Sequence, residues 1–215
     1  MHKIVTYPRT DSRYITPDIV PTLPERIAAL SGTIFSRVSD EYLSNGFVKD
    51  NPRFVDETKV SDHHAIIPTE EKVRVEKLSE EERKLWILIA LRFLETIGED
   101  YVYKTTTAEI EVDGYIFKTR LTLPLKKGYR NVAESAGVKS TSVSVELEDD
   151  SFALMRMKEG DEVTLESVKV RKTSTTPPER YTDATLLSAM EHAGRFVDDL
   201  SLKANLTSGL GTPAT

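Results

Sequence analysis

Residues 1 to about 98 show a spacing of hydrophobic positions that is typical of helices. Ser79-Glu80-Glu81-Glu82 is a capping box, in which the serine and the third glutamate satisfy free amide groups of a first helical turn. Apolar residues then follow up to Gly98, at Leu85, Trp86, Leu88, Ile89, Leu91, Phe93 and Leu94. This pattern predicts a helix that is buried on most of its circumference and ends at the glycine. Weaker helical patterns cover residues 22–30 and 34–43.

In the middle of the chain the hydrophobic period changes to two. Polar and apolar residues alternate over residues 105–112 and lead into Asp113-Gly114, which is a two-residue hairpin sequence. Residues 115–123 return from that turn, and residues 143–147 and 163–170 alternate in the same way. The alternation predicts a set of antiparallel strands.

The last part of the chain begins with Thr173-Ser174-Thr175-Thr176-Pro177-Pro178, where two prolines favour an extended linker. After it, Thr182 is placed to cap a helix over residues 183–192. The sequence therefore predicts an α+β protein with a helical domain at residues 1–98, an antiparallel β domain at 99–172, and a linker with a helical stub at 173–215.

Composition narrows the functional classes. The chain has 215 residues, of which 39% are hydrophobic and 30% charged, as in a soluble globular protein. The absence of cysteine excludes disulfides, thiolate zinc sites and cysteine nucleophiles. No apolar run approaches the roughly 18 residues of a membrane span, and no signal peptide is visible. With 29 basic and 35 acidic residues the net charge is −6, which argues against a general polyanion binder.

The densest cluster of polar residues surrounds Tyr7. Pro8 disfavours helical backbone at Tyr7, and in an extended segment Tyr7 and Arg9 share a face. A guanidinium binds two phosphate oxygens and stabilises a nearby phenolate, so this pair suits phosphate chemistry with tyrosine as the nucleophile. The spacing alone also allows a structural tyrosine in a turn, with Arg9 and Asp11 paired at the surface.

A second cluster contains His63 and His64. Adjacent histidines point to different faces and rarely bind one metal together, so no metal site is predicted. Asp62 could orient the imidazole of His63 and raise its basicity. The alternative is structural, with one histidine facing solvent and the other capping a helix.

Four segments, in this order, resemble motifs of the type IA DNA topoisomerases, and Pro8 with the paired histidines resembles the topoisomerase III branch. They are residues 4–14, 61–69, 177–187 and 209–215. The resemblance implies a toroidal enzyme in which residues 1–98 correspond to domain III, residues 99–172 to the arch of domain II, and residues 173–215 to the start of domain IV.

The resemblance also implies roles for single residues. Tyr7 would attack a phosphorus of one DNA strand, retain the 5′-phosphate as a phosphotyrosine, and allow another strand to pass for relaxation or decatenation. Arg9 would hold the scissile phosphate, and His63 would contact it, with His64 as the alternative histidine. Further contacts to DNA are expected at Thr10, Arg13 and Arg180.

Enzymes of this type bind Mg²⁺ in a TOPRIM domain, and no such domain precedes Tyr7 in this sequence. We therefore expect a fragment that binds no cofactor, is inactive by itself, and needs the TOPRIM domain and the rest of domain IV as partners. Single-stranded segments of DNA are the expected substrate, and the cytoplasm with its bacterial nucleoid is the expected location. Two alternatives remain at this point: a non-catalytic module that binds single-stranded DNA, and a topoisomerase I rather than III.

Overall fold

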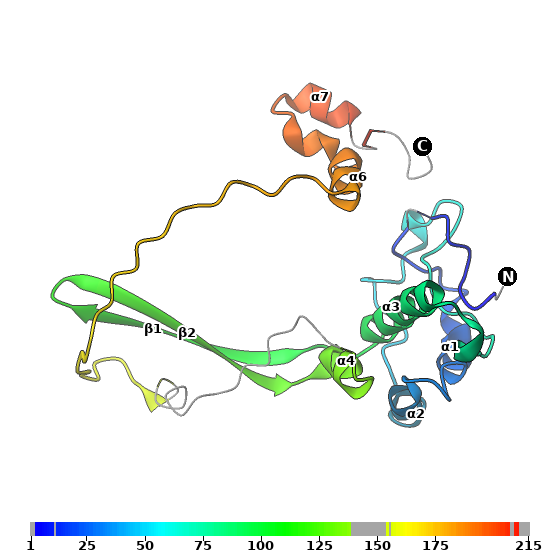
Figure 1. The fold of residues 1–215 in the computed structure, drawn as a ribbon, viewed down its shortest axis with the longest axis horizontal. Coiled ribbons are helices and arrows are strands. Elements are labelled where there is room, and N and C mark those ends of the chain that lie inside the picture. The colour runs from blue at the N-terminus through cyan, green and yellow to red at the C-terminus, as the bar shows by residue number, and fades with distance from the viewer. Residues whose placement is uncertain (1–2, 11, 139–153, 155, 207–208, 211–215) are drawn as a thin grey trace. The chain divides into compact units, whose positions relative to one another are not determined.

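The computed structural model describes residues 3–10, 12–138, 154, 156–206 and 209–210. The chain divides into two compact units, Met1–Leu165 and Glu166–Thr215, each of which is considered by itself. The regular secondary structure of the described part consists of helices and one antiparallel two-stranded sheet (Figure 1). This mixture confirms the predicted α+β class.

The first unit contains a helical body that is formed by α1 (Leu23–Ala28), α2 (Ser36–Asn45) and α3 (Glu80–Thr96). The capping box predicted at the start of α3 is confirmed. The amide of Glu82 donates to Ser79 Oγ at 3.2 Å, and the amide of Ser79 donates to Glu82 Oε2 at 2.9 Å. Single 3-10 turns occupy Val20–Thr22, Glu57–Lys59, Val75–Lys77 and Gly128–Arg130.

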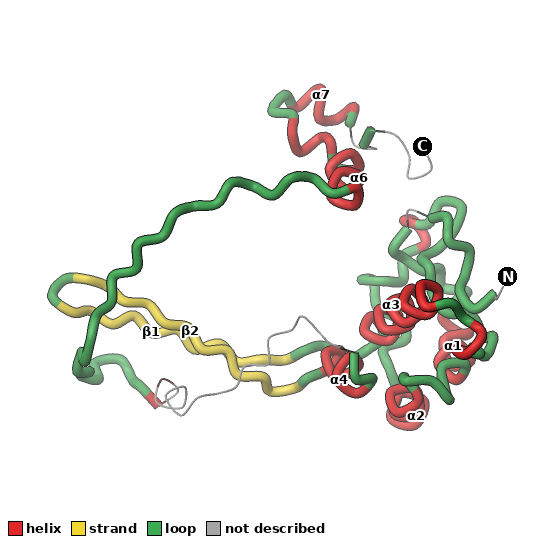
Figure 2. The backbone as a smooth tube through the Cα atoms, in the orientation of Figure 1, coloured by secondary structure: helices red, strands yellow, loops and turns green. Residues whose placement is uncertain are grey.

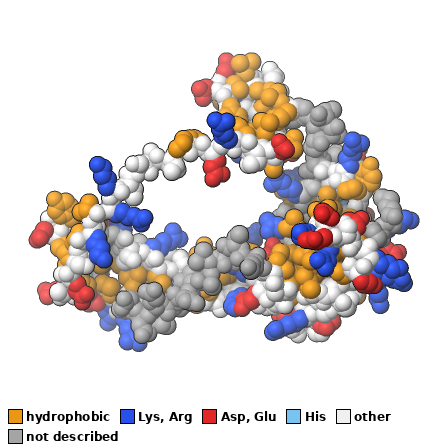
Figure 3. Space-filling view, viewed as in Figure 1, with side chains coloured by type: hydrophobic (Ala, Val, Ile, Leu, Met, Phe, Trp, Pro, Cys, Tyr) orange, Lys and Arg blue, Asp and Glu red, His pale blue; other side chains and the backbone are white. Residues whose placement is uncertain are grey.

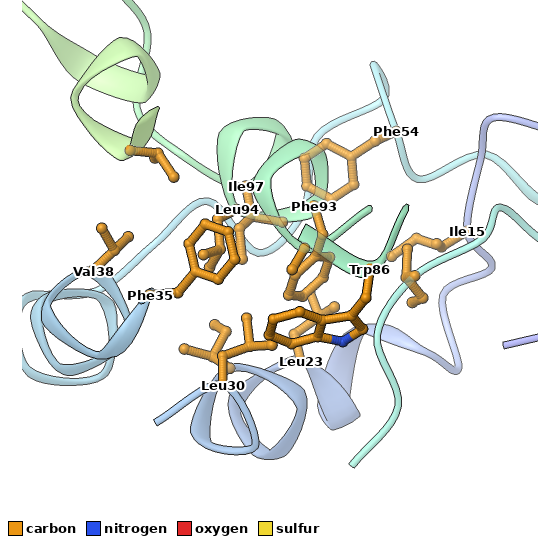
Figure 4. Close-up of a cluster of buried hydrophobic side chains, with 14 residues drawn as sticks. Ile15, Leu23, Leu30, Phe35, Val38, Phe54, Trp86, Phe93, Leu94 and Ile97 are labelled. Carbon is orange, nitrogen blue, oxygen red and sulfur yellow. The ribbon is translucent and has the colours of Figure 1, made fainter. Parts of the chain in front are cut away.

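The hydrophobic core lies between α3 and the earlier part of the body (Figure 4). Helix α3 contributes residues of one face: Trp86, Ala90, Phe93 and Leu94. The ring of Trp86 meets that of Phe35 edge-on, with centroids 5.9 Å apart. Leu85 and Leu88 are 59% and 61% exposed, so the expectation of a helix buried on most sides was wrong. The other elements of the body cover only the Trp86 face of α3.

The hairpin predicted around Asp113-Gly114 is confirmed. Strand β1 (Val102–Val112) pairs antiparallel with β2 (Tyr115–Lys126), and Val112 lies opposite Tyr115 (Figure 2). Asp113 and Gly114 have φ values of 50° and 80°, as a type I′ turn requires at both central positions.

Two further expectations for the β region change. Residues 163–170 form neither helix nor strand, and β1 and β2 are the only strands in the described part of the chain. The strand expected at 143–147 lies outside the described residues. Helix α4 (Asn131–Ser135), which the sequence did not predict, follows the hairpin and places Val132 in the core beside α2 and α3.

The second unit contains α6 (Asp183–Glu191) and α7 (Leu200–Asn205). The predicted cap is confirmed, because Thr182 Oγ1 accepts a hydrogen bond from the amide of Thr185 at 3.2 Å. Residues 166–182, which precede α6, have neither helix nor strand (Figure 2). Among the described helices, none combines the length and apolar character that crossing a membrane requires.

Candidate active site around Tyr7

The segment that contains Tyr7 is held against the histidine motif by backbone pairing. Val5 forms an antiparallel bridge with Pro68. The amide of Thr6 donates to the carbonyl of Ile67 at 2.9 Å, and the amide of Thr69 donates to Ile4 at 3.2 Å. Two parts of the chain that are some 60 residues apart therefore run side by side at the site.

Two threonine hydroxyls on either side of Tyr7 add to this pairing. Thr6 Oγ1 donates to the carbonyl of Ala65 at 3.2 Å and accepts the amide of Ile67 at 3.0 Å. Thr10 Oγ1 donates to the carbonyl of His63 at 2.7 Å. Both ends of the loop that presents Tyr7 are thus tied to the histidine motif.

Tyr7 lies beside His63. Their ring centroids are 4.5 Å apart with the planes tilted by 42°, and Tyr7 is 54% exposed. His64 is directed to the backbone instead, with Nδ1 2.8 Å from the carbonyl oxygen of Ala65. The half-exposed Tyr7 therefore has the ring of His63 beside its own, whereas His64 is turned to the backbone.

The other residues predicted to bind DNA lie in different settings. Arg9 and Arg13 are exposed on the same segment as Tyr7. The Thr10 hydroxyl donates to the carbonyl of His63 at 2.7 Å and accepts the amide of Ser12 at 3.0 Å. Arg180 belongs to the second unit, and Asp11 lies outside the described residues. Their roles toward DNA stay predictions.

Lys59 is a cation near this loop that the sequence reasoning missed. Its ammonium lies 4.4 Å from the centre of the Tyr14 ring and 3.3 Å from the Tyr14 hydroxyl, and it pairs with Asp56 at 2.9 Å. Its carbonyl oxygen accepts a hydrogen bond from the hydroxyl of Ser12 at 2.9 Å. Lys59 belongs to no motif in the sequence. It comes close to Tyr14 because the chain pairs Ile15 with Val55, which only the folded structure shows.

These contacts shift two pKa values. The pKa of the Asp56 carboxyl is lowered, first by the hydrogen bond from the Thr58 side chain and then by the one from Lys59. The pKa of Lys59 is raised, first by its hydrogen bond to Asp56 and then by the one to Tyr14. The two side chains therefore stay charged over a wider pH range than they would in isolation.

A mostly apolar groove of about 540 Å³ opens beside Tyr7. Ile4, Val5 and Pro8 line one side, and Leu85 and Ile89 of α3 line the other. Leu85 is exposed because it lines this groove, on a face of α3 that the rest of the helical body does not cover.

The arrangement of acidic and histidine side chains shows whether the described residues could hold a metal ion. Within the described ranges, no group of three histidine, aspartate or glutamate side chains is arranged to hold a metal ion. The described residues around Tyr7 therefore do not fit a Mg²⁺ site.

Comparison with known proteins agrees with the two motifs. A family model described as DNA topoisomerase matches residues 1–215. The protein named DNA topoisomerase 3 from Bacillus licheniformis is 39% identical over 218 residues, and its counterparts from Bacillus cereus and Bacillus subtilis (strain 168) are 38% and 37% identical. Each match covers 100% of this chain, which spans 29% of the length of these relatives. The chain belongs to the DNA topoisomerase family, and the curated relatives that it resembles are topoisomerase 3 enzymes.

Proposed function

We propose that this chain supplies the nucleophile of a type IA DNA topoisomerase of the topoisomerase III branch. The full-length protein would cleave one DNA strand, let another strand pass, and rejoin the first, with relaxation or decatenation as the result. The observation that supports this proposal is the contact between Tyr7 and His63, which brings the tyrosine and histidine motifs of the family together at an exposed tyrosine.

The reaction has two balanced transfers. In cleavage, Tyr7 Oη forms a bond to the phosphorus as the bond from phosphorus to the 3′-oxygen breaks. The phenol loses its proton, and the departing 3′-oxygen gains one. In religation the 3′-hydroxyl attacks the phosphotyrosine, and the proton transfers reverse. The ester conserves the free energy of the broken bond, so no ATP is needed.

Arg9 and His63 are the proposed phosphate contacts. Arg9 is exposed two residues after Tyr7, and its guanidinium stays charged and can bind two oxygens of one phosphate. Such a contact stabilises the charge that gathers on these oxygens in the transition state. His63 has the position beside Tyr7 for the second contact, whereas His64 is engaged with the backbone of Ala65. Thr10, Arg13 and Arg180 are proposed to bind the DNA backbone.

The remaining parts of the enzyme are proposed from the family. Mg²⁺ would be bound by a TOPRIM domain elsewhere in the full-length polypeptide, since the described residues here do not fit such a site. We propose that the groove between Pro8 and Leu85 accommodates that domain beside Tyr7. The substrate would be a single-stranded segment of DNA, and the location the cytoplasm of a bacterium. Residues 99–172 would contribute to the arch of a toroid, and residues 173–215 to the start of domain IV.

The decisive experiment substitutes Tyr7→Phe in the full-length protein. A labelled single-stranded oligonucleotide with Mg²⁺ is expected to form a covalent adduct with the unmodified protein and none with the variant, while the Kd for the oligonucleotide is retained. Tyr115→Phe is the matched control, because Tyr115 is 73% exposed at the hairpin turn and should change nothing. Adducts that persist in Tyr7→Phe would refute Tyr7 as the nucleophile, and binding without any adduct in the unmodified protein would favour a module that only binds DNA.

The same assay on the 215-residue chain tests its dependence on the other domains. We expect no adduct when the chain is incubated alone with the oligonucleotide and Mg²⁺. Formation of a Tyr7–DNA adduct under these conditions would contradict the proposed need for a TOPRIM domain.

A further inference from the structure

Arg26 is a charged residue that is almost entirely buried, with its side chain only 7% exposed. It lies on α1, outside all four segments that resemble family motifs. Its Nε donates to Thr22 Oγ1 at 2.8 Å, and its Nη1 donates to the carbonyl of Pro68 at 2.8 Å. Its Nη2 forms an ion pair with Glu70 at 2.7 Å. All three guanidinium nitrogens are therefore engaged, two of them with the segment 68–70, which lies beside the Tyr7 segment and pairs with it at one bridge.

The pairing of Val5 with Pro68 explains why the carbonyl of Pro68 needs a hydrogen-bond donor from elsewhere in the fold. The two segments are joined by backbone hydrogen bonds from Thr6 to Ile67 and from Thr69 to Ile4, which lie on either side of this pair. Val5 and Pro68 therefore form a non-hydrogen-bonded pair. In such a pair the backbone polar groups of both residues point away from the partner strand. A proline fits there without losing a bond, but its carbonyl oxygen faces the outer edge.

Burial makes this outer contact important. Pro68 is fully buried, so its carbonyl oxygen cannot turn to water, and an unpaired buried acceptor is costly. Arg26 has the reciprocal need: burial lowers its pKa, which the charges of Glu70 and then Glu25 oppose. A buried charge is tolerated when it is paired and hydrogen-bonded. The guanidinium therefore supplies the hydrogen-bond donor that the buried carbonyl of Pro68 needs. In return, Pro68 and Glu70 supply the acceptor and the negative charge that the buried guanidinium needs.

We propose that Arg26 is a positioning residue for Tyr7. By donating to the carbonyl of Pro68, it holds the segment against which Val5 and Thr6 pair, and so sets the place where Tyr7 meets His63. Arg26 itself touches neither DNA nor the reacting atoms. The proposal rests on the proposed function in one respect, that Tyr7 is the nucleophile.

The test is amide hydrogen exchange, followed by NMR on the 215-residue chain. Arg26→Lys keeps the charge, but an ammonium cannot serve the three partners with the geometry of a guanidinium. The amides of Thr6 and Thr69 are expected to exchange about tenfold faster relative to those of α3. The ring-current shift of His63 that arises from Tyr7 is expected to decrease in the same variant.

Three controls separate positioning from general stability. Glu70→Gln removes the ion pair but leaves the donor to Pro68, so the two strand amides should exchange as in the unmodified chain. Val38→Ala opens the core on α2 and should accelerate α3 and the strand alike. If Arg26→Lys does not fold, Thr22→Val removes the acceptor of Nε and is expected to produce the same selective change, about threefold.

Exchange that rises by one common factor throughout the helical body would overturn the proposal, and so would unchanged exchange at Thr6 and Thr69. In the full-length protein, Arg26→Lys should slow adduct formation about tenfold with an unchanged Kd for the oligonucleotide. An unchanged rate despite selective exchange would also overturn the link to Tyr7. Adducts formed by Tyr7→Phe would instead refute the proposed function and leave the exchange result standing.

Discussion

The hydroxyl of Thr6 is the most heavily used polar side chain between the tyrosine and histidine motifs. It donates to Ala65 and accepts from Ile67, while the amide of the same residue donates to the carbonyl of Ile67. Its position directly before Tyr7 means that these bonds restrict the backbone from which the proposed nucleophile projects. The bonds of Thr6 therefore matter for both stability and the geometry of the site.

Replacing Thr6 by valine removes the hydroxyl and leaves the amide of Ile67 without its side-chain acceptor. We expect the free energy of unfolding to fall by about 1–3 kcal/mol, since the site is half-buried. Urea unfolding of the chain measures the loss. Thr6→Ser, which keeps the hydroxyl, should retain most of the stability, and an equal loss in both variants would show that the methyl group contributes as much as the hydroxyl.

Asp56 predicts a pH dependence with a definite sign. Its pKa is lowered in the folded chain, so its bonds to Thr58 and Lys59 stabilise the fold at pH values above the ordinary carboxyl value of about 4. The contribution is lost as the pH falls through the lower, folded value. We expect Asp56→Asn to be less stable than the unmodified chain at pH 6, with the difference narrowing toward pH 2.5. A difference that is constant with pH, measured by urea unfolding, would contradict this assignment.

Among the elements, the junction between the helical body and the hairpin brings two backbone segments close together. Residues 98–101 leave the body and residues 127–131 return to it, and the amide of Tyr129 donates to the carbonyl of Glu99 at 2.7 Å. The guanidinium of Arg130 stands over the ring of Tyr101 at 3.8 Å. Helix α4 then returns Val132 to the core, so the body is closed by residues from both sides of the hairpin.

Gly128 is required at this junction for two reasons. Its φ is +51°, and a Cβ there would overlap the carbonyl group of Asp100. Gly32 is the matched control, because it also has a positive φ, of +84°, with nothing within 4 Å of a Cβ. We expect Gly32→Ala to cost about 1–2 kcal/mol from backbone strain.

Gly128→Ala should cost about 1–3 kcal/mol more than Gly32→Ala, because the overlap adds to the strain. Thermal or urea unfolding of the two variants gives the comparison. Equal losses would show that the two backbones can separate without cost.

Over the whole chain, the net charge of −6 does not describe the site. Acidic and basic side chains are interspersed on the face shown in Figure 3. Phosphate chemistry at Tyr7 needs a few placed cations, and Arg9 and Arg13 lie on the same exposed segment. The acidic composition is therefore compatible with the proposed DNA substrate and bears only on how strongly the chain would bind DNA in general.

The two compact units predict a pattern of proteolysis. Arg171 and Lys172 lie in the exposed stretch without helix or strand that begins the second unit, whereas Lys84 and Arg92 lie within α3. Because proteases need an extended, accessible backbone, trypsin should cut after Arg171 or Lys172 at least about tenfold faster than within α3. Mass spectrometry of a time course measures both rates. Cleavage within α3 at a comparable rate would contradict the compactness of the helical body.

Local sequence was sufficient wherever an element depends on its own neighbours. The capping box at Ser79, the Asp113-Gly114 turn and the Thr182 cap are set by bonds within a few residues, and all three predictions are confirmed. The motifs around Tyr7 and His63 likewise identified the family, because the residue types that phosphate chemistry needs are visible without a fold.

Contacts between distant parts of the chain could not be predicted from the local sequence. The open face of α3, the return of Val132 to the core, and the choice of His63 over His64 beside Tyr7 all depend on which segments pack together. The clamp of Arg26 on Pro68 joins residues 42 positions apart. Nothing local distinguishes such an arginine from one at the surface, since its burial and its partners exist only after the chain has folded.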